Sequence, residues 1–196
     1  MAIYDTAYIE VRGKEGGYAN DPDDPGGETY SGVARKRWPG WAGWKHVDRH
    51  KALTKSHSAL NQLLANDAQL QKLVKDFYFQ EFWLKVRCDI LGNYSEDLAI
   101  DVFDMAVNLG QGRAVEFIQR SCNALNNRQR DWPDIRVDGA FGPRTLAALE
   151  SCIAERGVKL LYKLLNILQG AWYVQLMEGR EANEKYLGWF SRVDFI

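Results

Sequence analysis

Residues 57–86 read HSALNQLLANDAQLQKLVKDFYFQEFWLKV, and their apolar side chains recur at the three- and four-residue spacing of an α-helix. These side chains are Leu60, Leu63, Leu64, Leu70, Leu73, Val74, Phe77, Tyr78, Phe82 and Val86. The same spacing continues through most of the later chain and predicts a long final helix from Leu161 to Leu176. Because no stretch combines β-branched residues with strict alternation, we predict a mainly α fold.

The sequence predicts a single compact unit made of two lobes. A soft boundary falls near 92–96, where Gly-Asn-Tyr-Ser precedes a new helical pattern. We therefore expect a first lobe at 1–92 and a helical lobe at 93–196, joined without a flexible linker. Two polar, turn-rich segments, 16–48 and 126–142, are predicted to be non-helical. Helix C-caps with positive φ are expected at Gly92, Gly110 and Gly157.

The composition excludes several classes of protein. Hydrophobic residues make up 46% of the 196 residues, which is enough for a sizeable core. The 25 Lys and Arg against 26 Asp and Glu give a formal charge of -1, which supplies no basic face for nucleic acid. No apolar run is long enough for a signal peptide or a membrane helix. We expect a monomer made in the cytoplasm without membrane insertion.

Potential metal ligands and stacking aromatics all have plainer interpretations. An odd number of cysteines without CxxC spacing predicts buried, reduced thiols at Cys88, Cys122 and Cys152. Histidines without metal-binding spacing are expected to be surface or hydrogen-bonded side chains at His46, His50 and His57. Sugar stacking is conceivable, but packing is favoured, for Trp38, Trp41 and Trp44. No metal or cofactor is implied.

The stretch that carries chemistry is Lys14–Gly32, KEGGYANDPDDPGGETYSG. Glu15 ends a short helical segment, where the negative end of the helix dipole opposes ionisation of its carboxyl group. Partial burial would raise its pKa further, as a glycosidase requires of its proton donor. Gly16 and Gly17 would end the helix and let a sugar approach the backbone. The same position also suits a solvated glutamate before a glycine C-cap.

The turn-rich segment after Glu15 offers several candidates for a second catalytic group. Asp24 with Thr29 would orient a water molecule on the far side of the glycosidic bond, and Asp21 or Asp23 are alternatives. The carboxylates also raise the alternative of a calcium site, which is disfavoured because the segment lacks the alternating ligands and central glycine of an EF-hand. The spacing alone does not choose among the aspartates.

The segment EGGYANDPDDPGGETYSGV resembles the signature of glycoside hydrolase family 108, a group of bacterial and phage muramidases. The resemblance implies a lysozyme-like superfamily fold, with the catalytic acid at Glu15. Related phage lysozymes use a similar E-x8-D-x5-T pattern. This chain has Asp24 at the matching position, Thr29 one position early, and Tyr30 where the pattern has threonine.

The resemblance extends over most of the chain. The run from Tyr78 to Trp83 is similar to the Y-x-x-x-[FY]-W helix of the family, and Asp104 to Gly110 resembles its D-x-x-x-N-x-G helix. Asp104 and Asn108 share one helical face, where they would either satisfy the backbone or face a cleft, and we favour the cleft. The segment at 137–145, VDGAFGPRT, resembles a turn of peptidoglycan-binding modules, although its Asp-Gly turn and helix-starting proline are folding devices first.

Together these motifs predict an endolysin, a muramidase that hydrolyses the β-1,4 bond between N-acetylmuramic acid and N-acetylglucosamine. The lobe at 1–92 would be catalytic, and the lobe at 93–196 would resemble a peptidoglycan-binding module. Substrate contacts are expected from Asn20, Tyr30, Asp104 and Asn108. Without an export signal, the enzyme would reach periplasmic peptidoglycan after release by a holin. The alternatives are a lytic transglycosylase and a non-catalytic wall-binding or secretion-accessory protein.

Overall fold

The computed structural model describes residues 2–12, 16–20, 27–179 and 187–193. Contacts divide the chain into two compact units, Met1–Trp83 and Leu84–Ile196. The predicted mainly α class is confirmed, since helices account for most of the described residues. Within those residues, no helix combines the length and the apolar character needed to cross a membrane. The sequence-based boundary between 92 and 93 stays a prediction.

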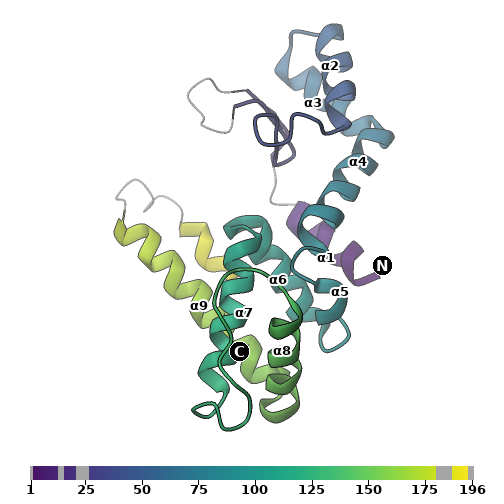
Figure 1. Cartoon of the computed structure of the whole chain (residues 1–196). Helices are drawn as coiled ribbons and strands as arrows, with labels where there is room; N and C mark the ends of the chain where they lie inside the picture. The colour runs from purple at the N-terminus through teal and green to yellow at the C-terminus, as the bar shows by residue number, and fades with distance from the viewer. Residues whose placement is uncertain (1, 13–15, 21–26, 180–186, 194–196) are drawn as a thin grey trace. The chain divides into compact units, whose positions relative to one another are not determined.

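The N-terminal unit consists of helices and one small sheet (Figure 1). Its elements are α1 (Ala2–Arg12), β1 (Tyr18–Ala19), β2 (Thr29–Tyr30), β3 (Val33–Ala34), α2 (Gly43–Leu53), α3 (His57–Asn66), α4 (Ala68–Tyr78) and the π-helix η1 (Phe79–Trp83). Helices α2, α3 and α4 contact one another, and α3 also contacts β1. The sheet falls inside the segment 16–48 that was predicted to be non-helical, and α2 begins inside it, so that prediction is wrong for 43–48.

The stretch 57–86 is divided by Asp67 rather than forming one continuous helix. Asp67 follows the last residue of α3 and precedes the first residue of α4. Its carboxylate oxygen accepts a hydrogen bond from the backbone N–H of Leu70 at 3.0 Å, which caps α4. Because the apolar spacing continues across this break, periodicity alone does not reveal it.

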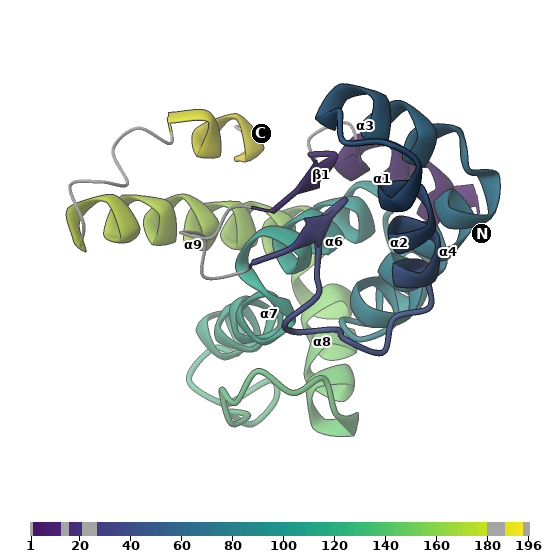
Figure 2. The same ribbon diagram turned by 90° about the horizontal axis from the view of Figure 1, so that it is seen from above.

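The C-terminal unit is wholly helical in its described regular structure. Its elements are α5 (Cys88–Leu91), α6 (Glu96–Leu109), α7 (Gln111–Leu125), α8 (Pro143–Arg156), α9 (Val158–Gly179) and the 3-10 helix η3 (Leu187–Arg192). Helix α7 is in contact with α6, α8 and α9, and its side chains form much of the core. The segment 126–142 leaves α7 and returns to start α8 (Figure 2).

Several predicted helix ends are confirmed. A helix starts after Ser95, which caps α6 by accepting from the backbone N–H of Leu98, and Pro143 is the first residue of α8. Gly110 and Gly157 have φ of 88° and 78°, which favours glycine. Gly92 has φ of -61°, so its predicted positive φ is wrong. Buried free thiols are confirmed at Cys88, Cys122 and Cys152.

Candidate active site

The predicted chemistry-bearing stretch contributes a three-stranded antiparallel sheet in the order β1-β2-β3. Tyr30 of β2 pairs with Tyr18 of β1 on one side and with Val33 of β3 on the other. Ser31 and Gly32 form the two-residue turn between β2 and β3, and their φ values are 48° and 77°. Two positive φ values in succession match the right-handed twist of a tight hairpin.

The two faces of this sheet differ in exposure. Tyr18, Tyr30 and Val33 lie on the face packed against the unit, with 8%, 2% and 0% of their surface exposed. Because side chains alternate along a strand, Thr29 and its two cross-strand neighbours lie on the opposite face. There Thr29 is partly exposed and Ala19 is exposed. The second face is therefore the accessible one.

Thr29 is the predicted site residue on the accessible face. It pairs with Ala19, and Asn20 follows directly after the end of β1. The hydroxyl of Thr29 donates to the carbonyl of Gly27 at 3.1 Å, and Asn20 is exposed. Glu15 and Asp24, like the alternatives Asp21 and Asp23, lie outside the described residues.

Tyr30 supports the sheet from beneath. Its side chain is 2% exposed, and its hydroxyl accepts a hydrogen bond from Nε2 of Gln71 at 2.8 Å. Beside it, the hydroxyl of Tyr78 donates to the carbonyl of Ser31 at 3.0 Å. Both partners belong to α4, so this helix fixes the hairpin. Tyr30 was expected to contact the substrate, but its ring is packed in the core and has no exposed surface for such a contact.

Glu28 is a residue that the sequence-based reasoning missed. Its carboxylate accepts from the Tyr18 hydroxyl at 2.9 Å and from the Lys51 ammonium at 2.6 Å. It also pairs with the guanidinium of Arg35 at 2.7 Å, and Arg35 in turn makes two hydrogen bonds to Asp48. Burial raises the pKa of Tyr18, so its phenol keeps its proton and donates. This cluster joins β1 to α2 directly before Thr29.

Gly17 is explained by a contact with α3. A Cβ atom at Gly17 would collide with the side-chain amide of Asn61. Oδ1 of Asn61 instead accepts from the backbone N–H of Tyr18 at 2.8 Å. Nε2 of His57 binds the Tyr18 carbonyl at 2.8 Å, so α3 holds both backbone groups of this residue. Close approach of α3, rather than of a sugar, occupies the space beside Gly17, whereas Gly16 is open.

In the C-terminal unit, Asp104 and Asn108 lie together on α6 but are differently engaged. Nδ2 of Asn108 donates to the Asp104 carbonyl one turn earlier at 2.8 Å, and Asn108 is exposed. Asp104 is buried, with 8% of its surface exposed, and its carboxylate pairs with the Arg192 guanidinium at 2.6 Å. Arg192, which the sequence-based reasoning also missed, thereby ties η3 to α6. The expected cleft-facing role of Asp104 gives way to an ion pair.

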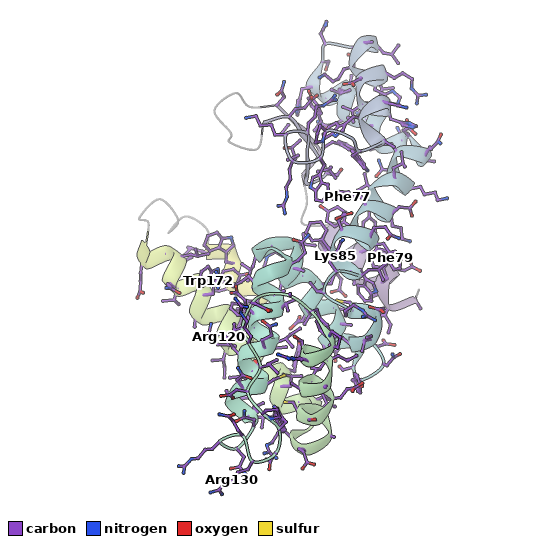
Figure 3. The ribbon with its side chains drawn as sticks, viewed as in Figure 1. Phe77, Phe79, Lys85, Arg120, Arg130 and Trp172 are labelled. Carbon is purple, nitrogen blue, oxygen red and sulfur yellow. The ribbon has the colours of Figure 1, made fainter. Side chains whose placement is uncertain are left out.

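The tryptophans and histidines take the plainer roles. Nε1 of Trp44 donates to the Trp38 carbonyl at 2.8 Å, and the rings of Trp38 and Phe77 meet edge to face at 5.1 Å. Figure 3 shows Phe77 on the α4 side of the unit. Hydrogen bonding is confirmed for the histidines, since His46 and His50 both bind Oδ2 of Asp67. Among the described residues, no group of three acidic, cysteine or histidine side chains is arranged to hold a metal ion.

The fold and the motifs define a two-part helical protein, and comparison with known proteins gives its class. Residues 8–110 match the family described as Glycosyl hydrolase 108, and residues 113–194 match the family described as Predicted Peptidoglycan domain. The first match covers more than half of the chain, so the protein belongs to the glycosyl hydrolase 108 family. The resemblance found in the sequence is thus confirmed.

A solved structure supports the same fold. The chain is similar to SagA of Brucella abortus, with a TM-score of 0.60 and 24% sequence identity over 98% of this chain and 90% of that one. At this identity the similarity shows the fold alone. No match was found among curated proteins. The family matches support a glycoside hydrolase that acts on peptidoglycan.

Proposed function

We propose that the protein is an N-acetylmuramidase that hydrolyses the β-1,4 bond between N-acetylmuramic acid and N-acetylglucosamine. The observation that carries the proposal is the family match at 8–110, which includes the Glu-Gly-Gly motif and is followed by a peptidoglycan family at 113–194. Because a glycosidase family match is followed by a match to a peptidoglycan family, we expect the substrate to be the glycan strand of peptidoglycan. Glu15 is proposed as the general acid that protonates the departing sugar oxygen.

The described part of the sheet supports a position for the attacking water. Thr29 lies on the accessible face of the sheet, and Asp24 belongs in sequence to the segment that joins β1 to β2. We propose that Asp24 or Thr29 holds the water that attacks the anomeric carbon. Asn20 and the exposed amide of Asn108 are proposed as contacts to hydroxyl or N-acetyl groups. Tyr30 is left out because its ring is buried.

The decisive test replaces the proposed acid. Glu15→Gln keeps the shape of the side chain but removes its transferable proton, so we expect clearance of purified peptidoglycan to slow roughly hundredfold or more. Glu10→Gln is the matched control, because Glu10 is an exposed glutamate of α1 in the same region of sequence. Equal clearance by wild type and Glu15→Gln would refute the assignment.

The products identify the reaction. Mass spectrometry of the released muropeptides should show reducing muramic acid ends, because water attacks the anomeric carbon. Anhydromuramic ends would replace the hydrolase with a transglycosylase. Binding of peptidoglycan without any release of fragments would instead indicate a wall-binding protein.

We extend the proposal to an endolysin that acts on periplasmic peptidoglycan after release through a holin pore. Expression in a Gram-negative host should then cause lysis only when a holin is co-expressed or the inner membrane is permeabilised. Lysis on expression of the chain alone would contradict the holin requirement.

A further inference from the structure

Two adjoining cavities lie in the C-terminal unit, between the segment 126–142 and α8. The first, of about 410 Å³, is lined in part by Trp132, Ile135 and Ala147. The second, of about 470 Å³, is lined in part by Gln119 and Arg136. Ile135 and Arg144 line both cavities, so the two adjoin, and we refer to them together as the groove. This groove lies within the region that matches the peptidoglycan family.

The groove is preformed, because two polar side chains of α7 hold its wall. Gln119, 1% exposed, accepts from the backbone N–H groups of Asp138 and Gly139 at 2.9 and 3.0 Å. Its amide nitrogen lies 3.0 Å from the Ala140 carbonyl. Asn123 binds both backbone groups of Ile135, at 2.8 and 2.9 Å. A ligand would therefore lose little affinity in ordering this wall.

The apolar end of the groove is fixed as well. Nε1 of Trp132 donates to the Cys122 carbonyl at 3.2 Å, and the Arg156 guanidinium lies over its ring at 5.5 Å. Trp132 is 5% exposed, so it presents only an edge to the first cavity. With Ile135 and Ala147 it makes a wall suited to methyl and methylene groups.

Two arginines of the groove carry charges that no acid of the described chain pairs with. Arg136 and Arg144 are exposed, and within the described ranges neither forms an ion pair or a hydrogen bond. The two acids of the groove are already engaged, since Asp138 accepts from Ala140 N–H and Gln119, and Asp134 accepts from Asn126 at 2.6 Å. Those hydrogen bonds, with Arg136 nearby, lower the pKa of Asp138 and keep it charged.

We propose that this groove binds the stem peptide of peptidoglycan, with peptide carboxylates on Arg136 and Arg144 and aliphatic parts against Trp132 and Ile135. Guanidinium groups bind carboxylates with paired, charge-assisted hydrogen bonds. The stem peptide combines several free carboxylates with short aliphatic side chains, which matches this pairing of cationic and apolar walls. Asp134, at the first cavity, binds Asn126 through Oδ1 only, so its second carboxylate oxygen would accept from the ammonium group of the stem diamino acid. The inference rests on the proposed function for its choice of peptide.

The test is calorimetric titration of the full chain with the free stem tetrapeptide L-Ala-γ-D-Glu-meso-diaminopimelyl-D-Ala. We expect saturable binding to the wild type. Arg144→Gln should raise the Kd roughly tenfold, since one charge-assisted pair is lost. Ala147→Trp, which fills the first cavity from an exposed position without changing charge, should weaken binding by a similar factor.

Arg130→Gln is the matched control, because Arg130 is an exposed arginine of the same segment that lines neither cavity (Figure 3). It should bind as the wild type does. The proposal is overturned if the tetrapeptide does not bind, or if Arg144→Gln and Ala147→Trp both bind it normally. It is also overturned if Arg130→Gln weakens binding as much as Arg144→Gln does. No glycan bond is cleaved in these titrations, so their failure is distinguishable from failure of the muramidase proposal.

Discussion

Each unit of the molecule has a polar side chain that binds several groups of a non-helical segment, but the two side chains are chemically different. In the N-terminal unit, the Glu28 carboxylate gathers Tyr18, Lys51 and Arg35. In the C-terminal unit, the neutral amide of Gln119 gathers the backbone around Asp138. The Glu28 side chain is 15% exposed and its cationic partners more so, whereas Gln119 is 1% exposed.

The difference follows from the cost of burying charge. A carboxylate can organise a segment where water still reaches its partners, but full burial would demand a large desolvation penalty. An amide offers both donors and acceptors without that penalty, provided that every group is paired. We therefore expect salt to weaken the stabilising contribution of Glu28 to the sheet and to leave that of Gln119 to the groove wall unchanged.

The largest effect is expected from breaking the buried anchor. Gln119→Leu leaves the N–H groups of Asp138 and Gly139 without their partner, so we expect a loss of about 3 kcal/mol in the free energy of unfolding. Urea denaturation followed by circular dichroism measures it. Gln175→Leu, an exposed glutamine of α9, should change stability little. Similar losses in both variants would show that Gln119 is no special anchor.

A second prediction concerns Asp67, which is more buried than Glu28 yet charged. Although burial opposes it, hydrogen bonds from His46, the Leu70 N–H and His50 hold the pKa of Asp67 well below its usual value. Asp67→Asn retains an oxygen for the helix cap but loses the charge, including the pair with Arg49 at 2.8 Å. At pH 7 we expect it to cost about 2 kcal/mol.

The pH dependence of that cost has a definite sign. A carboxylate with a lowered folded-state pKa stabilises the fold above its unfolded pKa of about 4, and this contribution is lost as pH falls toward the folded-state value. The gap between wild type and Asp67→Asn should therefore narrow below about pH 4. Urea midpoints of both proteins at pH 7 and at acid pH measure it. An unchanged gap would assign the effect to packing rather than to charge.

The smallest effect is expected at the exposed ionic anchor. Glu28→Gln removes the charge that faces Lys51 and Arg35, which are 35% and 30% exposed, so we expect a loss of about 1 kcal/mol at low salt. The difference in free energy of unfolding between wild type and Glu28→Gln should shrink in 1 M sodium chloride, because salt screens exposed pairs. The corresponding difference for Gln119→Leu should not shrink. If salt reduced the stability losses of Glu28→Gln and Gln119→Leu equally, the proposed difference between the charged and the neutral anchor would be wrong.

Periodicity and helix caps predicted most of the fold. The apolar spacing of α9, the start of a helix after Ser95 and Pro143 at the start of α8 depend on local sequence, and the structure confirms them. The sheet was missed because strands of two residues cannot show an alternating pattern. Its turn carries a Ser-Gly pair with two positive φ values, and that pair was the available signal.

The site was less predictable because its supporting contacts join residues distant in sequence. Lys51 meets Glu28 across 23 residues, and Arg192 meets Asp104 across 88 residues. Nothing in the local sequence pairs such charges, so Asp104 was read as facing a cleft. Tyr30 was expected at the substrate because of its place in the motif, but strand alternation turns it to the opposite face from Thr29.

The contact between Gly17 and Asn61 makes two distant positions mutationally dependent. Any larger residue at 17 is excluded while the Asn61 amide stands there, and a shorter residue at 61 would release the Tyr18 backbone. The two positions should therefore vary together among relatives and show epistasis when changed singly. Grafting the Glu-Gly-Gly motif onto another scaffold would require transplanting the helix that carries Asn61 with it.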